Sequence, residues 1–333
     1  MWLNQGDASV DRDTPYGLQI NTQPRTPVPW SEMEFNIEKI DYLDHFQILK
    51  PKLDGNLATP EMERKCIEYA YDWFMYMTTH EADREVFEAS VLIVAAITIL
   101  EEKASTTMGC SIFGFPLDAL LEAMDRALHP RASKRLRALV AQSVDSHGSR
   151  QEGCLEKQIK TLQSISSCYF SYMQWRNVDG YYEVAMLCSF AAMGESCAEL
   201  TVGVANDILE AAILAHDTHS VLRHFEEDEI ANCHRYLHSN LQTSISLALK
   251  RVALLRNRIR FDPTIPLSIK KCAMVSISAC HSFNYACRRY RYGADFAAAT
   301  SFVNSSHQFD NPFKSPIPAD ASQSYSELIK SIV

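Results

Sequence analysis

The stretch Ala89-Ser-Val-Leu-Ile-Val-Ala-Ala-Ile-Thr-Ile-Leu100 decides the fold class, because it is almost entirely apolar. A helix that is hydrophobic on every face must be surrounded by other elements. The stretch is shorter than the ~18–20 residues that a membrane-spanning helix needs, and Ser90 and Thr98 interrupt it. A second stretch, Tyr181 to Met193, has the same character. The sequence therefore predicts central helices wrapped by outer helices in an all-α bundle.

The 3.6-residue hydrophobic period continues on both sides of this stretch, and alternating strand patterns are nearly absent. Pro60 and Pro116 are expected in the first turns of helices, where the missing N–H costs nothing. Breaks are expected at Gly109 to Gly114, at Ser146 to Ser149 and at Asp262-Pro263. The predicted helices are 61–78, 83–103, 116–128, 131–145, 152–175, 180–193, 197–215, 227–259 (interrupted), 265–291 and 294–304.

Proline-dotted residues 1–58 show little periodicity and predict an irregular N-terminal arm. Residues 59–304 predict a single α-helical domain, and the Ser/Pro/Asn-rich residues 305–333 predict a loosely held C-terminal tail. Two arrangements of the domain satisfy the pattern. One is a filled bundle, and the other is a bundle around an apolar ligand cavity lined by the central helices.

The composition excludes several classes of protein. A formal net charge of -9 argues against a nucleic-acid binder, which would present a basic face to phosphates. The polar N-terminus has no signal-peptide core, and with no predicted membrane span we expect a cytoplasmic protein. The 10 cysteines form no CxxC pair and predict buried free thiols, not a zinc site. His234 and His238 are expected to face solvent. No nucleophile elbow, phosphate loop, dinucleotide turn or HExxH motif occurs.

Polar groups stand at the ends of several of the apolar helices. Arg289-Tyr290 closes the helix predicted over 265–291, and a guanidinium beside a phenol suits the binding of a phosphate-type anion at the mouth of an apolar cavity. Asn206-Asp207 and Glu101-Glu102 offer oxygen ligands for a metal. Together these groups point to an enzyme that ionises a hydrophobic diphosphate.

Four short segments follow one another in order along the predicted domain. They are Ile99 to Glu102, Trp175-Arg176 with Gly180, Asn206 to Leu209, and Arg289 to Arg291. Their order and spacing resemble class I terpene synthases, most nearly the fungal trichodiene-synthase-like branch. That family has an Asp-rich motif, a diphosphate-sensing arginine, a second metal motif and a terminal Arg-Tyr pair in this order.

The resemblance implies a helical barrel around an apolar cavity. It also implies a lyase that ionises and cyclises a prenyl diphosphate, with farnesyl diphosphate as substrate, a sesquiterpene as product and diphosphate released. In that family Mg²⁺ ions bridge the carboxylates to the phosphate oxygens, and the arginines bind the same oxygens. Carried over to this chain, Arg176, Arg289 and Tyr290 would bind the diphosphate, and Glu101, Glu102, Asn206 and Glu210 would hold Mg²⁺.

A carbocation formed in such a cavity needs apolar walls and aromatic faces, each of which stabilises a cation by roughly 0.5–2 kcal/mol. The aromatic residues expected to bind the substrate are Tyr69, Trp73, Phe170, Trp175, Phe283 and Tyr285. Tyr285 lies one helical turn before Arg289, which would place an aromatic ring under the diphosphate.

Two departures from the family pattern concern the metal. Glu101-Glu102-Lys103 replaces an Asp-rich motif, and Leu214 stands where the second motif has its last acid. Three functions therefore stay open: a metal-dependent lyase, a metal-independent pseudo-terpene synthase that cyclises, adds to or rearranges a biosynthetic intermediate, and a non-catalytic isoprenoid binder. The oligomeric state, monomer or homodimer, stays open as well.

Overall fold

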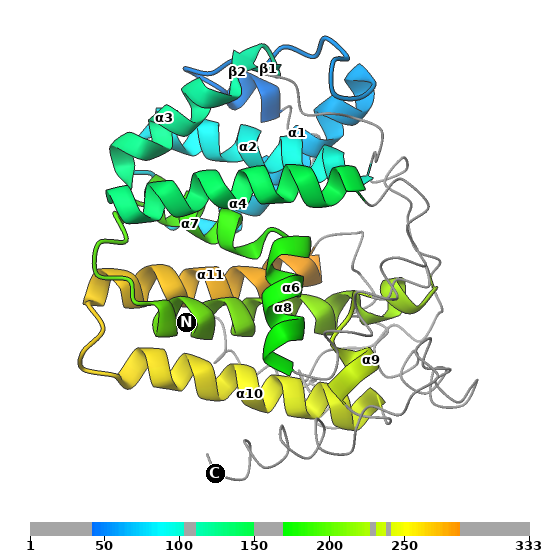
Figure 1. Ribbon diagram of the computed structural model, residues 1–333, viewed down its shortest axis with the longest axis vertical. Coiled ribbons are helices and arrows are strands. Elements are labelled where there is room, and N and C mark those ends of the chain that lie inside the picture. Colours follow the sequence, from blue (N-terminus) through cyan, green and yellow to red (C-terminus); the bar gives the residue numbers. More distant parts are fainter. Residues whose placement is uncertain (1–41, 103–110, 150–168, 227–230, 238–240, 287–333) are drawn as a thin grey trace, which may run out of the picture.

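The computed structural model describes residues 42–102, 111–149, 169–226, 231–237 and 241–286. This part of the chain is all-α, as predicted, apart from a hairpin in which β1 (Ser111–Ile112) pairs antiparallel with β2 (Phe115–Pro116). Figure 1 shows the helices stacked as a bundle, with α10 along one outer edge and α3 near the opposite one. In chain order they are η2 (Tyr42–His45), α1 (Pro60–Met77), α2 (Arg84–Glu102), α3 (Leu117–Ala127), α4 (Pro130–Ser149), α6 (Tyr169–Asp179), α7 (Tyr182–Ala192), α8 (Val202–Glu226), α9 (His234–Leu237), α10 (Leu241–Phe261) and α11 (Leu267–Ala286).

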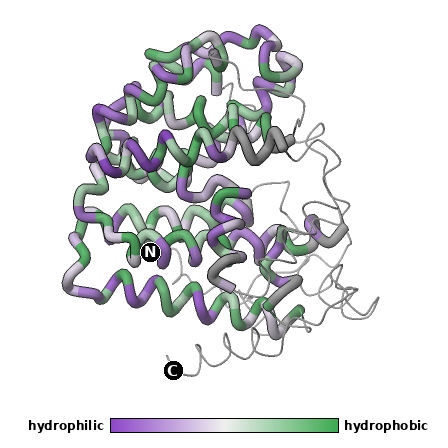
Figure 2. Tube along the Cα trace, viewed as in Figure 1, coloured by the Kyte–Doolittle hydropathy of each residue, from purple (hydrophilic) through white to green (hydrophobic). Residues whose placement is uncertain are grey.

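The two apolar stretches form the centre of the bundle. From Val91 to Leu100, no side chain of α2 is more than 2% exposed, and α7 is buried at every position except Glu183. α2 packs against α1, α3, α4 and α7. The outer helices have one polar face, and in Figure 2 hydrophilic and hydrophobic residues alternate along α10, at the lower edge of the view. No helix in the described ranges is both long and apolar enough to cross a membrane.

Local signals explain where several helices begin and end. Thr59 caps α1, its hydroxyl accepting the Met62 N–H at 3.3 Å, and Pro60 occupies the first turn as predicted. The same prediction was wrong for Pro116, which belongs to β2 and precedes the first residue of α3. Asp262 begins the turn after α10, where its carboxylate accepts the backbone N–H of Thr264 at 2.8 Å.

The helix predicted over 197–215 begins later and ends later than expected. Cys197 has a φ of 62°, a left-handed conformation that a helix cannot contain, and α8 starts only at Val202. At its other end α8 continues to Glu226 through a run of polar residues that the structure buries. The part of the helix predicted over 152–175 that precedes Tyr169, and the whole of 294–304, lie outside the described residues.

Two buried glutamates hold residues 42–58, which belong to the predicted N-terminal arm. Glu88 of α2 is 0% exposed, and its carboxylate accepts the backbone N–H groups of residues 47–49 at 2.6 to 2.9 Å. Glu63 of α1 accepts three further N–H groups between residues 55 and 58 at 3.0 to 3.3 Å. Each carboxylate thus accepts hydrogen bonds from backbone N–H groups that have no partner in a helix or sheet.

A third acid, Asp72 of α1, makes the stability of this region depend on pH. Tyr42 Oη donates to its carboxylate at 3.2 Å, but burial dominates and raises the pKa of Asp72 to about 6. Because this pKa is higher than the unfolded value of 3.8, the stability contributed by the protonated acid is complete below pH 3.8 and is lost as the pH rises through about 6. At neutral pH the folded protein therefore carries a costly buried charge.

The substitution Asp72→Asn should raise the free energy of unfolding at pH 7.5 by up to about 3 kcal/mol, and by about half of that at pH 5. Urea unfolding at the two pH values measures both gains. Asp44→Asn, at an exposed position in the 3-10 helix that contains Tyr42, is the matched control and should change the free energy of unfolding little at either pH. An equal gain in the free energy of unfolding at both pH values would contradict the raised pKa of Asp72.

Candidate functional site

Three of the predicted wall residues meet in the structure, although they lie at opposite ends of the described chain. Tyr69 and Trp73 project from α1 and Phe283 from α11, and all three are buried. The ring centroids of Tyr69 and Phe283 lie 5.3 Å apart edge to face, and those of Trp73 and Phe283 lie 6.2 Å apart in a stacked arrangement. Tyr181, just before α7, adds an edge contact to Trp73 at 6.1 Å. We call these four residues the aromatic cluster.

The other predicted site residues are placed less completely. Trp175 is half-buried on α6, where it packs against the hydrophobic core and its ring lies 6.0 Å from that of Tyr172. Several predictions fall beyond what the structure describes and stay predictions. The side chains of Phe170, Tyr285, Glu101 and Glu102 lie outside the described part, as do Arg289 and Tyr290 entirely.

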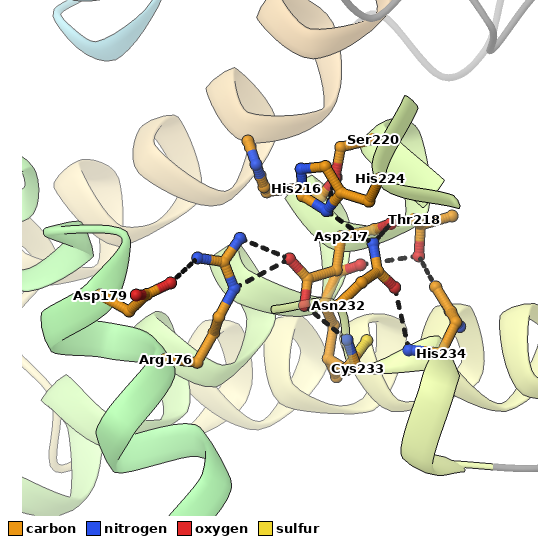
Figure 3. A network of polar contacts seen from close by, with 11 residues as sticks. Arg176, Asp179, His216, Asp217, Thr218, Ser220, His224, Asn232, Cys233 and His234 are labelled. Carbon is orange, nitrogen blue, oxygen red and sulfur yellow. Dashed lines mark hydrogen bonds and ion pairs between the residues drawn. The ribbon is translucent and has the colours of Figure 1, made fainter. Parts of the chain in front are cut away.

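Arg176 of α6 is buried between two carboxylates (Figure 3). Its Nη2 and Nε donate to Asp217 Oδ1 at 3.0 and 3.3 Å, and its Nη1 donates to Asp179 Oδ2 at 2.8 Å. Burial alone would lower the pKa of Arg176, but the Asp217 carboxylate, together with Tyr182 and Tyr172, outweighs burial and raises this pKa well above the usual value. The arginine is therefore charged and is held inside the protein by Asp179 and Asp217.

Gly180 makes room for this arrangement. A Cβ at this position would lie 2.4 Å from the ring of Tyr182 and 3.0 Å from the Arg176 guanidinium. The guanidinium in turn lies 5.5 Å from the centre of the Tyr182 ring, within cation–π range. A larger residue at 180 would therefore force apart the groups that hold Arg176.

Asp217 is the centre of a wider buried polar network on α8 and the residues before α9 (Figure 3). Its Oδ2 accepts the Cys233 N–H at 2.8 Å, and its backbone oxygen accepts Asn232 Nδ2 at the same distance. Asn232 Nδ2 also lies 3.1 Å from His224 Nδ1. Burial raises the pKa of Asp217, while Arg176 and the Cys233 N–H oppose that rise.

His234 belongs to the same network, so the prediction that it faces solvent was wrong. Its imidazole is 0% exposed and lies 2.8 Å from Ser244 Oγ and 3.0 Å from Thr218 Oγ1. Burial lowers the pKa of His234 to about 3, so the ring is neutral at physiological pH. His238 lies outside the described residues.

The second predicted metal motif, on α8, is occupied by ion pairs. Arg251 of α10 binds both oxygens of Glu210, at 2.7 and 3.0 Å, and Tyr169 Oη donates to Glu210 at 2.9 Å. Asn206 is exposed and Leu214 is fully buried. These three positions do not fit a Mg²⁺ site in this arrangement, because Mg²⁺ would have to displace the guanidinium from the one carboxylate present. Within the described ranges no group of three or more His, Cys, Asp or Glu side chains is arranged to hold a metal ion.

Sequence reasoning missed both partners, Arg251 for Glu210 and Asp217 for Arg176. One signal could have indicated the second of these. Tyr169 and Arg176 are seven residues apart on α6, and so are the two acids that they bind, Glu210 and Asp217 on α8. Residues seven apart share a helix face, so two matching pairs favour direct contact between the helices. Figure 1 shows α6 lying across α8.

The chain matches no protein-family model, and no curated protein matches its sequence.

Proposed function

We propose that this protein binds a hydrophobic isoprenoid-type substrate in a class I terpene synthase-like bundle and catalyses its cyclisation, addition or rearrangement without a divalent metal. The observation that carries the proposal is the bidentate ion pair between Glu210 and Arg251. In this pair Arg251 binds both oxygens of the acid that the family resemblance would assign to Mg²⁺.

The electrostatics of this pair support a reaction that needs no metal at Glu210. The two side chains are 11% and 8% exposed, so their interaction is only weakly screened by water. A guanidinium stays charged at any ordinary pH and matches both carboxylate oxygens at once. Arg251 thus supplies, within the protein, the positive charge that a bound ion would otherwise bring to Glu210.

The aromatic cluster supports the choice of substrate class. Tyr69, Trp73 and Phe283 are large and buried, and their rings are of the type that stabilises a developing carbocation and excludes water. In this proposal the anionic or polar end of the substrate is bound by Arg289 and Tyr290, which follow α11 in the sequence. Arg176 has a different role, since Asp179 and Asp217 hold it: it positions α6 against α8.

Isothermal titration calorimetry with farnesyl diphosphate, once in buffer with Mg²⁺ and once in buffer with EDTA, tests the proposal. We expect the dissociation constants in the two buffers to lie within about two-fold of each other. Glu210→Gln should leave both within about two-fold of the wild-type values, because in this proposal Glu210 binds no metal ion. Glu199→Gln, an exposed acid before α8, is the matched control. Phe283→Ala should weaken binding about ten-fold or more through lost apolar contact.

An assay of diphosphate release, with gas chromatography of the organic products, separates this proposal from the metal-dependent lyase. With C10, C15 and C20 prenyl diphosphates and Mg²⁺ we expect no diphosphate release by the wild-type protein. Release that requires Mg²⁺ and is abolished by Glu210→Gln would establish the metal-dependent lyase instead. Absence of binding to all three diphosphates and to their alcohols would rule out an isoprenoid substrate altogether.

A further inference from the structure

One end of the bundle gathers exposed apolar side chains. In the described ranges five large hydrophobic residues are exposed, and three of them stand at helix ends: Val202 starts α8, Phe261 ends α10 and Leu267 starts α11. Their exposed fractions are 77%, 69% and 67%. Single exposed hydrophobic residues are common on proteins, but a group of them on one surface marks an interaction site.

These three helix ends share one side of the molecule. α8 packs against both α10 and α11, and Figure 1 shows the start of α8, the end of α10 and the start of α11 on the left of the view. Arg258 near the end of α10 pairs with Asp207 near the start of α8 at 3.2 Å. Asp262, between α10 and α11, lies close enough to Lys270 and Arg258 for both to lower its pKa, after the larger effect of the Thr264 hydrogen bonds.

The same surface is basic, although the whole chain carries a net charge of -9. Arg258, Arg260 and Lys271 are exposed, and Lys270 and Arg256 are half-buried. The nearby acids are fewer: Asp207 is buried and paired with Arg258, and Asp262, Glu199 and the half-buried Glu195 remain. We call the exposed side chains of Val202, Arg258, Arg260, Phe261, Leu267 and Lys271 the basic end.

We propose that the basic end docks on an anionic lipid bilayer. Phe261 and Leu267 would enter the boundary between headgroups and acyl chains, and Arg260 with its neighbours would contact lipid phosphates. Exposed aromatic and aliphatic side chains surrounded by Arg and Lys are the combination that binds such a surface, and the charge complementarity favours it over a neutral or basic partner. The surface is separate from the aromatic cluster, and the proposal does not depend on the reaction proposed above.

Co-sedimentation of the full chain with vesicles tests it. We expect binding to phosphatidylcholine vesicles that contain about 30% phosphatidylglycerol, weaker binding at high salt, and little binding to pure phosphatidylcholine. Each basic residue near the surface contributes about five-fold to the partition coefficient, so Arg260→Glu/Lys271→Glu should lower it by at least about twenty-fold. Phe261→Ser/Leu267→Ser should lower it by about ten-fold or more.

Matched controls come from elsewhere on the described surface. Ile48→Ser/Met75→Ser removes the two other exposed hydrophobic residues, which are 54% and 57% exposed, and Lys50→Glu/Lys52→Glu reverses two exposed charges. Both controls should bind like the wild type, and circular dichroism should show every variant folded. Equal losses in the controls, equal binding to neutral vesicles, or no binding to either vesicle would overturn the proposal. Capture by immobilised polyglutamate without vesicle binding would overturn it in favour of an acidic polypeptide.

Discussion

Replacing Asp217 by alanine should lower the free energy of unfolding by about 3–5 kcal/mol, because it removes one partner of a buried ion pair and leaves the other charge inside the protein. Arg176 is 4% exposed and would keep only Asp179 as a described charged partner. The Cys233 N–H would lose its acceptor as well. Urea unfolding at pH 7.5, followed by circular dichroism, measures the loss.

The matched control lies on the same helix. Asp207 also pairs with an arginine, Arg258, but that side chain is 64% exposed, so water can solvate it when the acid is removed. Asp207→Ala should therefore cost less than about 1 kcal/mol. Equal urea midpoints for the two variants would show that Asp217 is no more important than an acid whose arginine partner is exposed, and the buried network would lose its assigned role.

The substitution Glu88→Gln should lower the free energy of unfolding by about 3–4 kcal/mol, although it conserves shape. An amide NH₂ would replace one of the two oxygens that accept the N–H groups of residues 47–49. At least one backbone N–H would then lie against an NH₂ group and lose its acceptor. Arg84, which donates to Glu88 at 2.8 Å, would lose its buried counter-charge. Hydrogen exchange at residues 47–49 should accelerate in parallel, because their amides would open to water.

Glu85→Gln is the control for this variant. Glu85 lies in the first turn of the same helix and pairs with Arg126 at 2.8 Å, but both side chains are well exposed. Exposed pairs contribute little, and we expect a change below about 1 kcal/mol. If both substitutions shift the urea midpoint equally, the backbone hydrogen bonds to Glu88 do not stabilise the fold.

Hydrophobic periodicity was enough to predict most of the helices, because the residues of each apolar face recur every three to four positions in the sequence. The helix predicted over 61–78 is α1, Pro60–Met77, and the helix predicted over 83–103 is α2, Arg84–Glu102. The same method failed on α8, whose last part contains Asp217, Thr218 and His224. These residues are buried and hydrogen-bonded to one another or to neighbouring elements, whereas a periodicity argument assigns polar residues to solvent.

The site was predictable only where a residue's own position decides its surroundings. Tyr69, Trp73 and Phe283 each lie on the apolar face of a helix, so their meeting in the core could be expected. Arg251 as the partner of Glu210 could not be predicted, since that contact depends on how far α10 is shifted along α8. That shift is set by packing between helices, and spacing within a single helix does not record it.

The hydrogen bonds to Glu63 and Glu88 also determine where a shortened version of this protein can start. A chain trimmed to begin at Pro60 would keep every α-helix of the described part, yet both carboxylates would remain inside without the amides that solvate them. An unsolvated internal charge draws in water or a proton, and either outcome loosens α1 against α2. Expression boundaries placed ahead of Tyr42 retain all six amides and avoid this fault.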